Sequence, residues 1–454
     1  MAGIGFELQK VLDSEKNYFP KVSVALKSMF ITSGPWIISI VTLLLVKFFV
    51  KDIIEKTLFL DFMNILIYCF IFSMILSAPF INIITRYLSD KIYEKNFDSI
   101  FAIFISGIIV IGSISFSISA TYVYFYTGFV ENTIHIASLF TAFSILWLIM
   151  VFISTLKDYN LVTYSFLFGM ILSFLLLFYV LNTSLEELLK GFTIGTLSSI
   201  CVLIAKLKLD FKTDKIFDFK FLINPKYIPL FISGFFLYLA MWIDKFVYWF
   251  SLKGVELSKG FYFFPDYDFV VFISYLLLIP TTAYFTIYIE TVFYEHQRDY
   301  FSAIENKKNL SVIQSYENEL KNSFYKGLIR VSVFQFILSL LFVVSIQYIL
   351  DNTNTNIASI PLLRITVFAV SLQMILNTLI IFLYYFDYQK EVLSISLIFF
   401  ISNLLISLFM KDLPYEYVGY SYFYSVLFTL FVAMIISLYK IDRINFYVFS
   451  KNEV

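Results

Sequence analysis

Long apolar runs, separated by short polar segments, dominate the chain. Many of them exceed 18 residues, and a helix needs about 20 apolar residues to cross about 30 Å of hydrocarbon. A β-barrel would instead show short segments of alternating polarity, so the spans are predicted to be helices. The twelve predicted spans lie near residues 24–48, 62–85, 100–126, 134–155, 161–181, 189–205, 227–250, 269–292, 327–349, 359–385, 392–410 and 419–438.

The composition agrees with an all-α polytopic membrane protein. Of the 454 residues, 60% are hydrophobic and 15% are charged, and the mean hydropathy is +0.83. No soluble domain of this length needs so much apolar surface. The net charge is zero and the basic residues are spread over loops, so no nucleic-acid partner is expected.

Residues that carry common chemistries are sparse. The sequence has no GxxxxGKS/T, GxSxG or HExxH motif, and His135 and His296 lack metal-ligand spacing. We therefore expect no metal, no cofactor and no enzymatic activity. For the enzymatic alternative, a membrane-embedded glycosyl- or acyltransferase, the acidic cluster to nominate is Asp266 with Asp268. A solvated loop explains that cluster better.

Two stretches roughly 200 residues apart repeat each other. The matching features are SMILSAP at Ser73–Pro79 with SYLLLIP at Ser274–Pro280, Tyr93-Glu94 with Tyr294-Glu295, and Ser33-Gly34 with Ser233-Gly234. Internally duplicated membrane proteins are usually transporters, because two similar bundles can rock around a site between them. The repeat therefore predicts two six-helix lobes.

The predicted lobes are joined by a basic segment. An N-terminal lobe at 1–205 holds spans 1 to 6, a linker at 206–226 carries six lysines, and a C-terminal lobe at 227–454 contains an insertion at 294–326. The linker lysines are expected to face anionic lipid headgroups, with partner docking as the alternative. The first residues are predicted to form a short amphipathic helix on the membrane surface, with a flexible polar tail as the alternative.

Lysine and arginine concentrate in alternate polar segments. Every second segment, starting with the N-terminal one, holds most of the 33 basic residues. This bias predicts that both termini lie in the cytoplasm. The start of the chain lacks the basic residues and the cleavage site of a signal peptide, so no cleavage is expected.

Two adjacent charges lie inside predicted span 7, in the stretch YLAMWIDKFVYWF. Asp244 and Lys245 are placed roughly 12 Å from its outer end at 1.5 Å per residue. A charge inside a span costs at least about 2.5–3.5 kcal/mol on insertion scales, so it normally faces a cavity or a partner. Adjacent helical residues point about 100° apart, so the two charges are not expected to neutralise each other face to face. Arg364, at a comparable depth in span 10, is the predicted partner of Asp244.

Two interpretations of this pair stay open. In the first, Asp244 and Lys245 line a water-filled substrate path, in which Tyr238 and Trp242 stack on sugar rings. In the second, the pair is a fixed ion pair that holds helices together. Tyr248 and Trp249 are expected to belong to an outer aromatic belt.

Proline and glycine interrupt three spans. Gly34 and Pro35 lie in the TSGPW stretch of span 1, and Pro79 and Pro280 occupy equivalent places in spans 2 and 8. Proline lacks a backbone donor, so the freed carbonyl needs another partner. Because Pro79 and Pro280 recur in both halves, we predict that they act as hinges; kinks that serve packing alone are the alternative.

Seven motifs occur in order along the chain: MAGIGFEL, SGPW, TRYLSDKIYE, WIDK, YDFVVFISYLLLIP, FYEHQRDYFSAI and YYFDYQKE. Together they resemble the PelG family, the multi-spanning inner-membrane components of Pel exopolysaccharide export. Tyr275, Thr281 and Thr282 depart from the smaller residues expected at those places.

The resemblance implies a flippase fold of the MOP type, with two six-helix lobes around a central cavity in the bacterial cytoplasmic membrane. It implies the export of a polymer rich in N-acetylgalactosamine. The partners that it implies are the glycosyltransferase PelF and the membrane proteins PelE and PelD, of which PelD senses cyclic di-GMP. Contacts with them are expected at the basic loops and at Val312–Phe324. The alternatives are a lipid-linked oligosaccharide flippase, a small-molecule exporter, and a scaffold that anchors PelF.

Overall fold

The computed structural model describes residues 29, 33, 37, 56–153, 159–179, 184–211, 215–351 and 360–451. Within these ranges, eleven helices are long and apolar enough to cross a membrane. They correspond to predicted spans 2 to 12, and those predictions are confirmed. Only three residues of predicted span 1 are described, and the predicted N-terminal amphipathic helix, Gly34 and Pro35 lie outside the described residues.

The described residues fold into two compact units. Unit 1 extends to Trp242 and includes Trp249–Phe264, whereas unit 2 contains Ile243–Tyr248 and the residues from Pro265 onward. Helix α9 (Ile228–Trp249) therefore contributes residues to both units. The predicted lobe boundaries at the basic linker stay a prediction.

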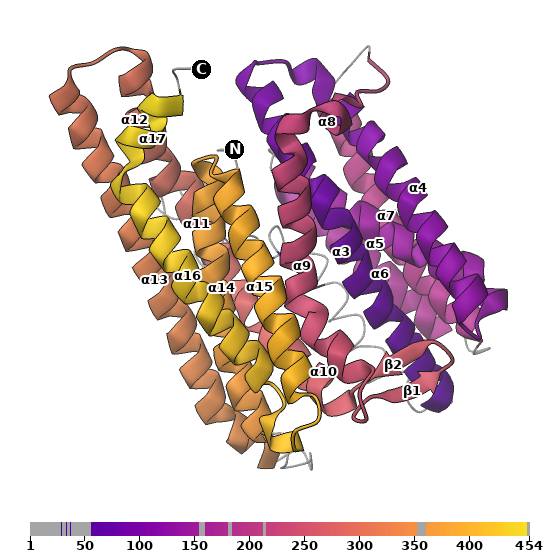
Figure 1. The fold of residues 1–454 in the computed structure, drawn as a ribbon. Coiled ribbons are helices and arrows are strands. Elements are labelled where there is room, and N and C mark those ends of the chain that lie inside the picture. The colour runs from indigo at the N-terminus through magenta and orange to yellow at the C-terminus, as the bar shows by residue number, and fades with distance from the viewer. Residues whose placement is uncertain are drawn as a thin grey trace. The chain divides into compact units, whose positions relative to one another are not determined.

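Unit 1 is a helical bundle with a small hairpin (Figure 1). Its elements, besides α9, are α3 (Lys56–Tyr93), η1 (Phe97–Ser99), α4 (Ile100–Tyr126), η2 (Val130–Asn132), α5 (Thr133–Ile153), α6 (Tyr159–Tyr179), α7 (Leu185–Asp210), α8 (Lys220–Ile223), η3 (Pro225–Tyr227), β1 (Val255–Ser258) and β2 (Phe261–Phe263). Helix α5 packs against α3, α4 and α7. Helices α6 and α7 touch through Gly169 and Gly195, where an added Cβ would lie within 2.7 Å of the other glycine's carbonyl oxygen. Small residues permit this close approach between membrane helices.

Unit 2 is built around α14. Its other elements are α10 (Pro265–Leu276), α11 (Leu278–Tyr288), the π-helical segment η4 (Ile289–Phe293), α12 (Tyr294–Glu305), α13 (Leu310–Asp351), α14 itself (Ile360–Tyr385), α15 (Gln389–Met410), η6 (Tyr415–Tyr417), α16 (Tyr420–Asp442) and α17 (Ile444–Lys451). Helix α14 packs against α10, α11, α13, α15 and α16, and 72% of its apolar window is buried. In unit 1 the most buried span is α5, at 67%. These are predicted spans 10 and 4, so among the described spans the most buried helix has the same place in each predicted half.

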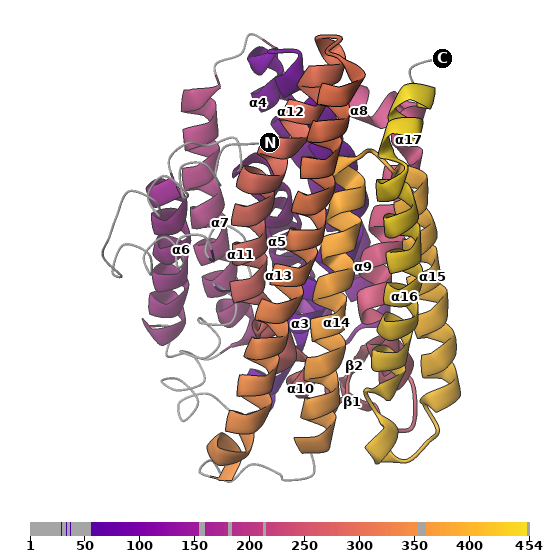
Figure 2. The ribbon, with the colours of Figure 1, turned by 90° about the vertical axis from the view of Figure 1, so that its left-hand side faces the viewer.

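The predicted insertion forms a helical hairpin. Helix α12 and the first part of α13 extend beyond the end of α14 (Figure 2). Helix α12 ends at Glu305 and α13 begins at Leu310, so the hairpin turns at the residues between them. Helix α13 buries Ile313 and Glu317, whereas Val312 is exposed. Leu320 and Phe324 are buried as well, so the buried face of α13 passes through these positions and excludes Val312.

Candidate functional site

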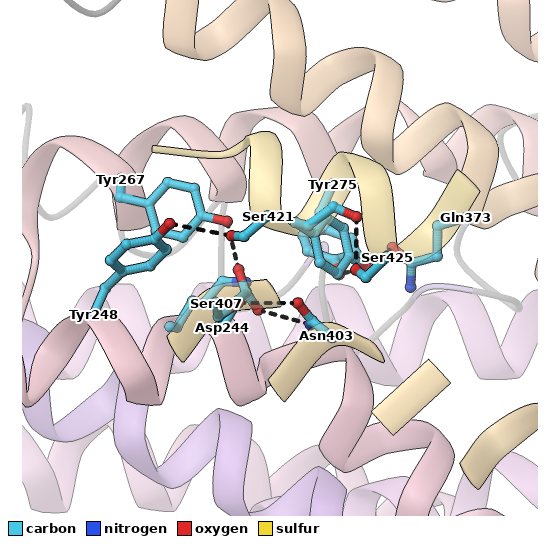
Figure 3. Close-up of polar contacts among 11 residues, drawn as sticks. Asp244, Tyr248, Tyr267, Tyr275, Gln373, Asn403, Ser407, Ser421 and Ser425 are labelled. Atoms are coloured by element: carbon cyan, nitrogen blue, oxygen red, sulfur yellow. Dashed lines mark hydrogen bonds and ion pairs between the residues drawn. The ribbon is translucent and has the colours of Figure 1, made fainter. Parts of the chain in front are cut away.

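A buried polar cluster in unit 2 surrounds Asp244 and Lys245 of α9 (Figure 3). Asp244 is 0% exposed and Lys245 is 2% exposed. The Lys245 Nζ lies 3.8 Å from Asp244 Oδ1. The expectation that these neighbours cannot neutralise each other is wrong, because the long lysine side chain bridges the angle between adjacent helical positions.

The Asp244 carboxylate accepts hydrogen bonds from two other helices. The Tyr267 hydroxyl of α10 donates to Oδ2, and Asn403 Nδ2 of α15 donates to Oδ1 at 3.4 Å. The Ser407 hydroxyl donates to Asn403 Oδ1 at 3.2 Å, which leaves the amide NH₂ group directed at the carboxylate. Hydrogen bonds to a charged group are the strong ones, so α9 is joined to α10 and α15 at this point.

Three tyrosine rings surround the Lys245 ammonium. The Nζ atom lies 5.6 Å from the ring centroid of Tyr422, 5.7 Å from that of Tyr267 and 5.8 Å from that of Tyr275. A cation within about 6 Å of an aromatic ring is attracted by the negative ring face. The cluster therefore holds its positive charge with one carboxylate and several aromatic rings.

A second layer of hydrogen bonds fixes the tyrosines (Figure 3). The Tyr275 and Tyr422 hydroxyls lie 3.0 Å apart, and the Tyr422 hydroxyl donates to Gln373 Oε1 of α14 at 2.5 Å. Tyr248, one turn after Asp244, places its hydroxyl 3.2 Å from the Ser421 hydroxyl of α16. Five helices, α9, α10, α14, α15 and α16, thus meet in one network.

The structure does not bring Arg364 to Asp244. Arg364 is exposed on α14, whereas Asp244 is fully buried and pairs with Lys245, Tyr267 and Asn403. The predicted Arg364–Asp244 ion pair is therefore wrong. Depth along a span says nothing about which face of its helix a side chain occupies, and the site already contains its own cation.

Tyr238 and Trp242 lie outside this network. They precede Asp244 by six and two residues, so they project from other faces of α9. Tyr238 is half-buried, and Trp242 is buried in unit 1. Their predicted role in stacking on sugar rings stays a prediction.

The aromatic belt predicted for Tyr248 and Trp249 is absent, because both side chains are buried in protein. Tyr248 belongs to the polar network of unit 2. The Trp249 ring stacks on Tyr68 in unit 1, with centroids 4.9 Å apart. The Tyr68 hydroxyl in turn donates to the Tyr262 carbonyl oxygen of β2 at 3.0 Å. Tyr68 therefore links the end of α9 to the β1–β2 hairpin.

The two repeated prolines lie in different surroundings. Helix α3 passes through Pro79 without interruption. In contrast, α10 ends at Leu276 and α11 begins at Leu278. Leu276 is the residue whose carbonyl the missing N–H of Pro280 would have bonded, which explains the break. The hinge role of Pro79 and Pro280 stays a prediction.

Most partners of the charged pair had only weak signals in the sequence. Gln373 and Asn403 are amide side chains inside predicted spans, and such residues usually face the interior of a bundle. The tyrosines could not be singled out, because the chain contains 33 of them. Among the described residues, no group of three or more His, Cys, Asp or Glu side chains is arranged to hold a metal ion.

Solved structures with the same fold are transporters. The chain is similar to an outward-facing multidrug resistance MATE family transporter of the MOP superfamily, with 11% identity, 98% of this chain and 97% of that chain covered, and a TM-score of 0.62. It is also similar to MATE in complex with MaL6 (12% identity, 93% and 95% covered, TM-score 0.64) and to a MOP superfamily transporter from Pyrococcus furiosus (12%, 93% and 95%, 0.59).

Because these sequence identities are low, the structural similarities establish the fold alone. The chain is a multi-pass membrane protein with the architecture of MOP superfamily transporters. The family model of the PelG exopolysaccharide exporters (EPS-E) matches residues 1–449. The chain therefore belongs to the PelG family, and the resemblance noted in its motifs is confirmed. No curated protein matches the chain in sequence.

Proposed function

We propose that this chain moves a Pel-type exopolysaccharide, rich in N-acetylgalactosamine, across the bacterial cytoplasmic membrane. The family match over residues 1–449 carries this proposal, and the transporter fold supports it. The polymer would pass between the two helical lobes, as in the rocking mechanism of duplicated transporters. The distribution of lysine and arginine supports cytoplasmic termini.

The proposed export is coupled to PelF, with PelD and PelE as membrane partners. The hairpin of α12 and α13, together with α17, offers a fixed surface for such contacts. The Tyr300 hydroxyl donates to Asn445 Oδ1 at 2.6 Å, and the Asn445 amide donates to Glu317 of α13. The Tyr325 hydroxyl of α13 donates to Asp442 Oδ1 at 3.0 Å. Helices α12, α13 and α17 and the end of α16 are thereby tied together. A fixed surface loses little entropy when a partner binds.

We assign the Asp244 cluster a structural part in transport. A group that lines a water-filled path is solvated, whereas Asp244 and Lys245 are almost completely buried. Their network ties Ile243–Tyr248 of α9 to the other helices of unit 2, and the rest of α9 packs in unit 1. The cluster would therefore keep this part of the shared helix moving with unit 2.

Deletion of the gene in its host tests the proposal. Polymer inside and outside the cell is quantified while the amount of PelF is monitored. Intracellular polymer without extracellular polymer, with PelF present and active, is the expected result. Unchanged secretion would overturn the proposed function, and loss of polymer in both compartments would favour the scaffold alternative.

A further inference from the structure

A groove of about 350 Å³ opens between the start of α15 and the end of α16. It is separate from the Asp244 cluster, with which it shares no residue. Its lining includes Lys390 and Ser394 of α15 together with Ile435, Ile436, Tyr439 and Lys440 of α16. No residue of the groove takes part in the proposed transport.

The groove carries an excess of positive charge. Lys390 is exposed and forms no salt bridge with another described residue. Lys440 Nζ lies 2.5 Å from Glu391 Oε1 and 3.8 Å from the ring centroid of Tyr447. Arg443, next to the groove, donates from Nη1 to the Tyr439 hydroxyl at 2.6 Å.

Glu391 is the acidic residue in the lining, against Lys390 and Lys440. The neighbouring Asp442 is directed elsewhere, because its carboxylate accepts from Tyr325 of α13. With Arg443 beside the groove, three cations face one anion. This charge is complementary to a phosphate group.

The polarity of the groove changes along the helices. Lys390 is the second residue of α15 and Lys440 lies two residues before the end of α16, so the cations occupy the ends of the spans. Ile435 and Ile436 lie about one turn deeper in α16, and Ile435 is 54% exposed. A phosphate at the membrane surface and a hydrocarbon chain below it would meet matching surfaces in this order. A soluble phosphate would not contact the apolar half of the groove.

We propose that this groove binds an anionic glycerophospholipid. Its headgroup phosphate lies among Lys390, Lys440 and Arg443, and one acyl chain lies along Ile435 and Ile436. Basic pockets between membrane helices are a known setting for anionic headgroups. Because Lys440 also contacts Tyr447 of α17, the bound headgroup lies beside the C-terminal helix.

Native mass spectrometry of the purified full-length chain tests the proposal, with phosphatidylglycerol or phosphatidylcholine added. We expect phosphatidylglycerol to stay bound at collision energies that remove phosphatidylcholine. The double variant Lys390→Gln/Arg443→Gln should retain at least about fivefold less phosphatidylglycerol. The matched control Lys307→Gln/Lys326→Gln removes two exposed cations from the α12–α13 hairpin and should bind like the wild type.

A second variant, Ile435→Trp, keeps all charges and fills the space that the acyl chain would occupy. Ile435→Trp fills the apolar half of the groove and should also lower the retained phosphatidylglycerol, with the thermal midpoint of each variant recorded as a check on folding. Equal retention of the two lipids, equal loss in the control, or unchanged binding in Ile435→Trp would overturn the proposal. Displacement of the lipid by free glycerol phosphate alone would assign the site to a soluble phosphate instead and would also overturn it.

Discussion

Replacing Asp244 by asparagine leaves the Lys245 ammonium buried without its counter-charge, and replacing Lys245 by methionine does the converse. Both side chains are buried in the centre of a five-helix network, so neither charge left behind can reach water without disrupting the packing. The double variant Asp244→Asn/Lys245→Met removes both charges with little change in volume. The three variants therefore separate the cost of an uncompensated charge from the cost of losing the pair.

The distance between the two charges sets the size of the expected losses in the free energy of unfolding. At 3.8 Å and an effective dielectric constant of about 20, the attraction between the two charges is about 4 kcal/mol. Breaking a buried pair from one side typically costs about 3–5 kcal/mol, whereas replacing both partners is often neutral. For Asp244→Asn we expect a loss of about 3 kcal/mol, at the lower end, because three tyrosine rings still attract the ammonium. The double variant should be no less stable than the worse single variant, which gives a coupling of at least about 3 kcal/mol, the smaller of the two single losses.

Unfolding of the purified protein in mixed micelles with increasing dodecyl sulfate measures these differences in the free energy of unfolding. Asp412→Asn and Lys326→Met are matched controls, because they remove exposed charges from the same unit. Each control should change stability by less than about 0.5 kcal/mol. Strictly additive losses in the double variant would refute the reasoning, since independent sites show no coupling.

Three further predictions concern other contacts. Tyr267→Phe removes a hydrogen bond to the buried carboxylate and should cost about 1.5–3 kcal/mol in the same unfolding assay. In Gly234→Leu the new Cβ would lie 2.9 Å from the Ala78 carbonyl oxygen, so overpacking of α9 against α3 should cost about 1–3 kcal/mol; Gly112→Ala, with its nearest neighbour at 3.8 Å, is the control and should be tolerated. Pro280→Ala restores a backbone donor and should slow amide hydrogen exchange between α10 and α11; if the break acts as a hinge, export falls while the amount of protein is unchanged.

The spans could be predicted because hydrocarbon imposes a simple rule of length and polarity on the sequence. Helix α4 begins and ends at the predicted residues, 100 and 126. Long helices deviated where polar segments continue the helix beyond the membrane, as in α13, which begins 17 residues before predicted span 9. Hydropathy identifies the part of such a helix that lies inside the membrane, and it does not identify where the helix begins and ends.

The site was only half predictable, for a physical reason. A charge inside a span is costly, so Asp244 and Lys245 stood out in the sequence. Their partners come from other helices, and Asn403 is 159 residues away from Asp244. A single sequence records neither the rotation of each helix nor its neighbours. Depth alone therefore suggested Arg364, and the position of Tyr248 near a span end suggested a lipid-facing ring where a buried one was found.

We propose that this chain itself carries the polymer across the membrane. Inverted membrane vesicles that contain PelF, PelD and PelE, with or without this chain, are supplied with a labelled nucleotide sugar and then treated with a glycoside hydrolase that degrades the polymer. With the chain present, labelled polymer should become protected inside the vesicles; without it, polymer should still form but remain accessible to the hydrolase. Protection that is equal in both preparations would contradict the account.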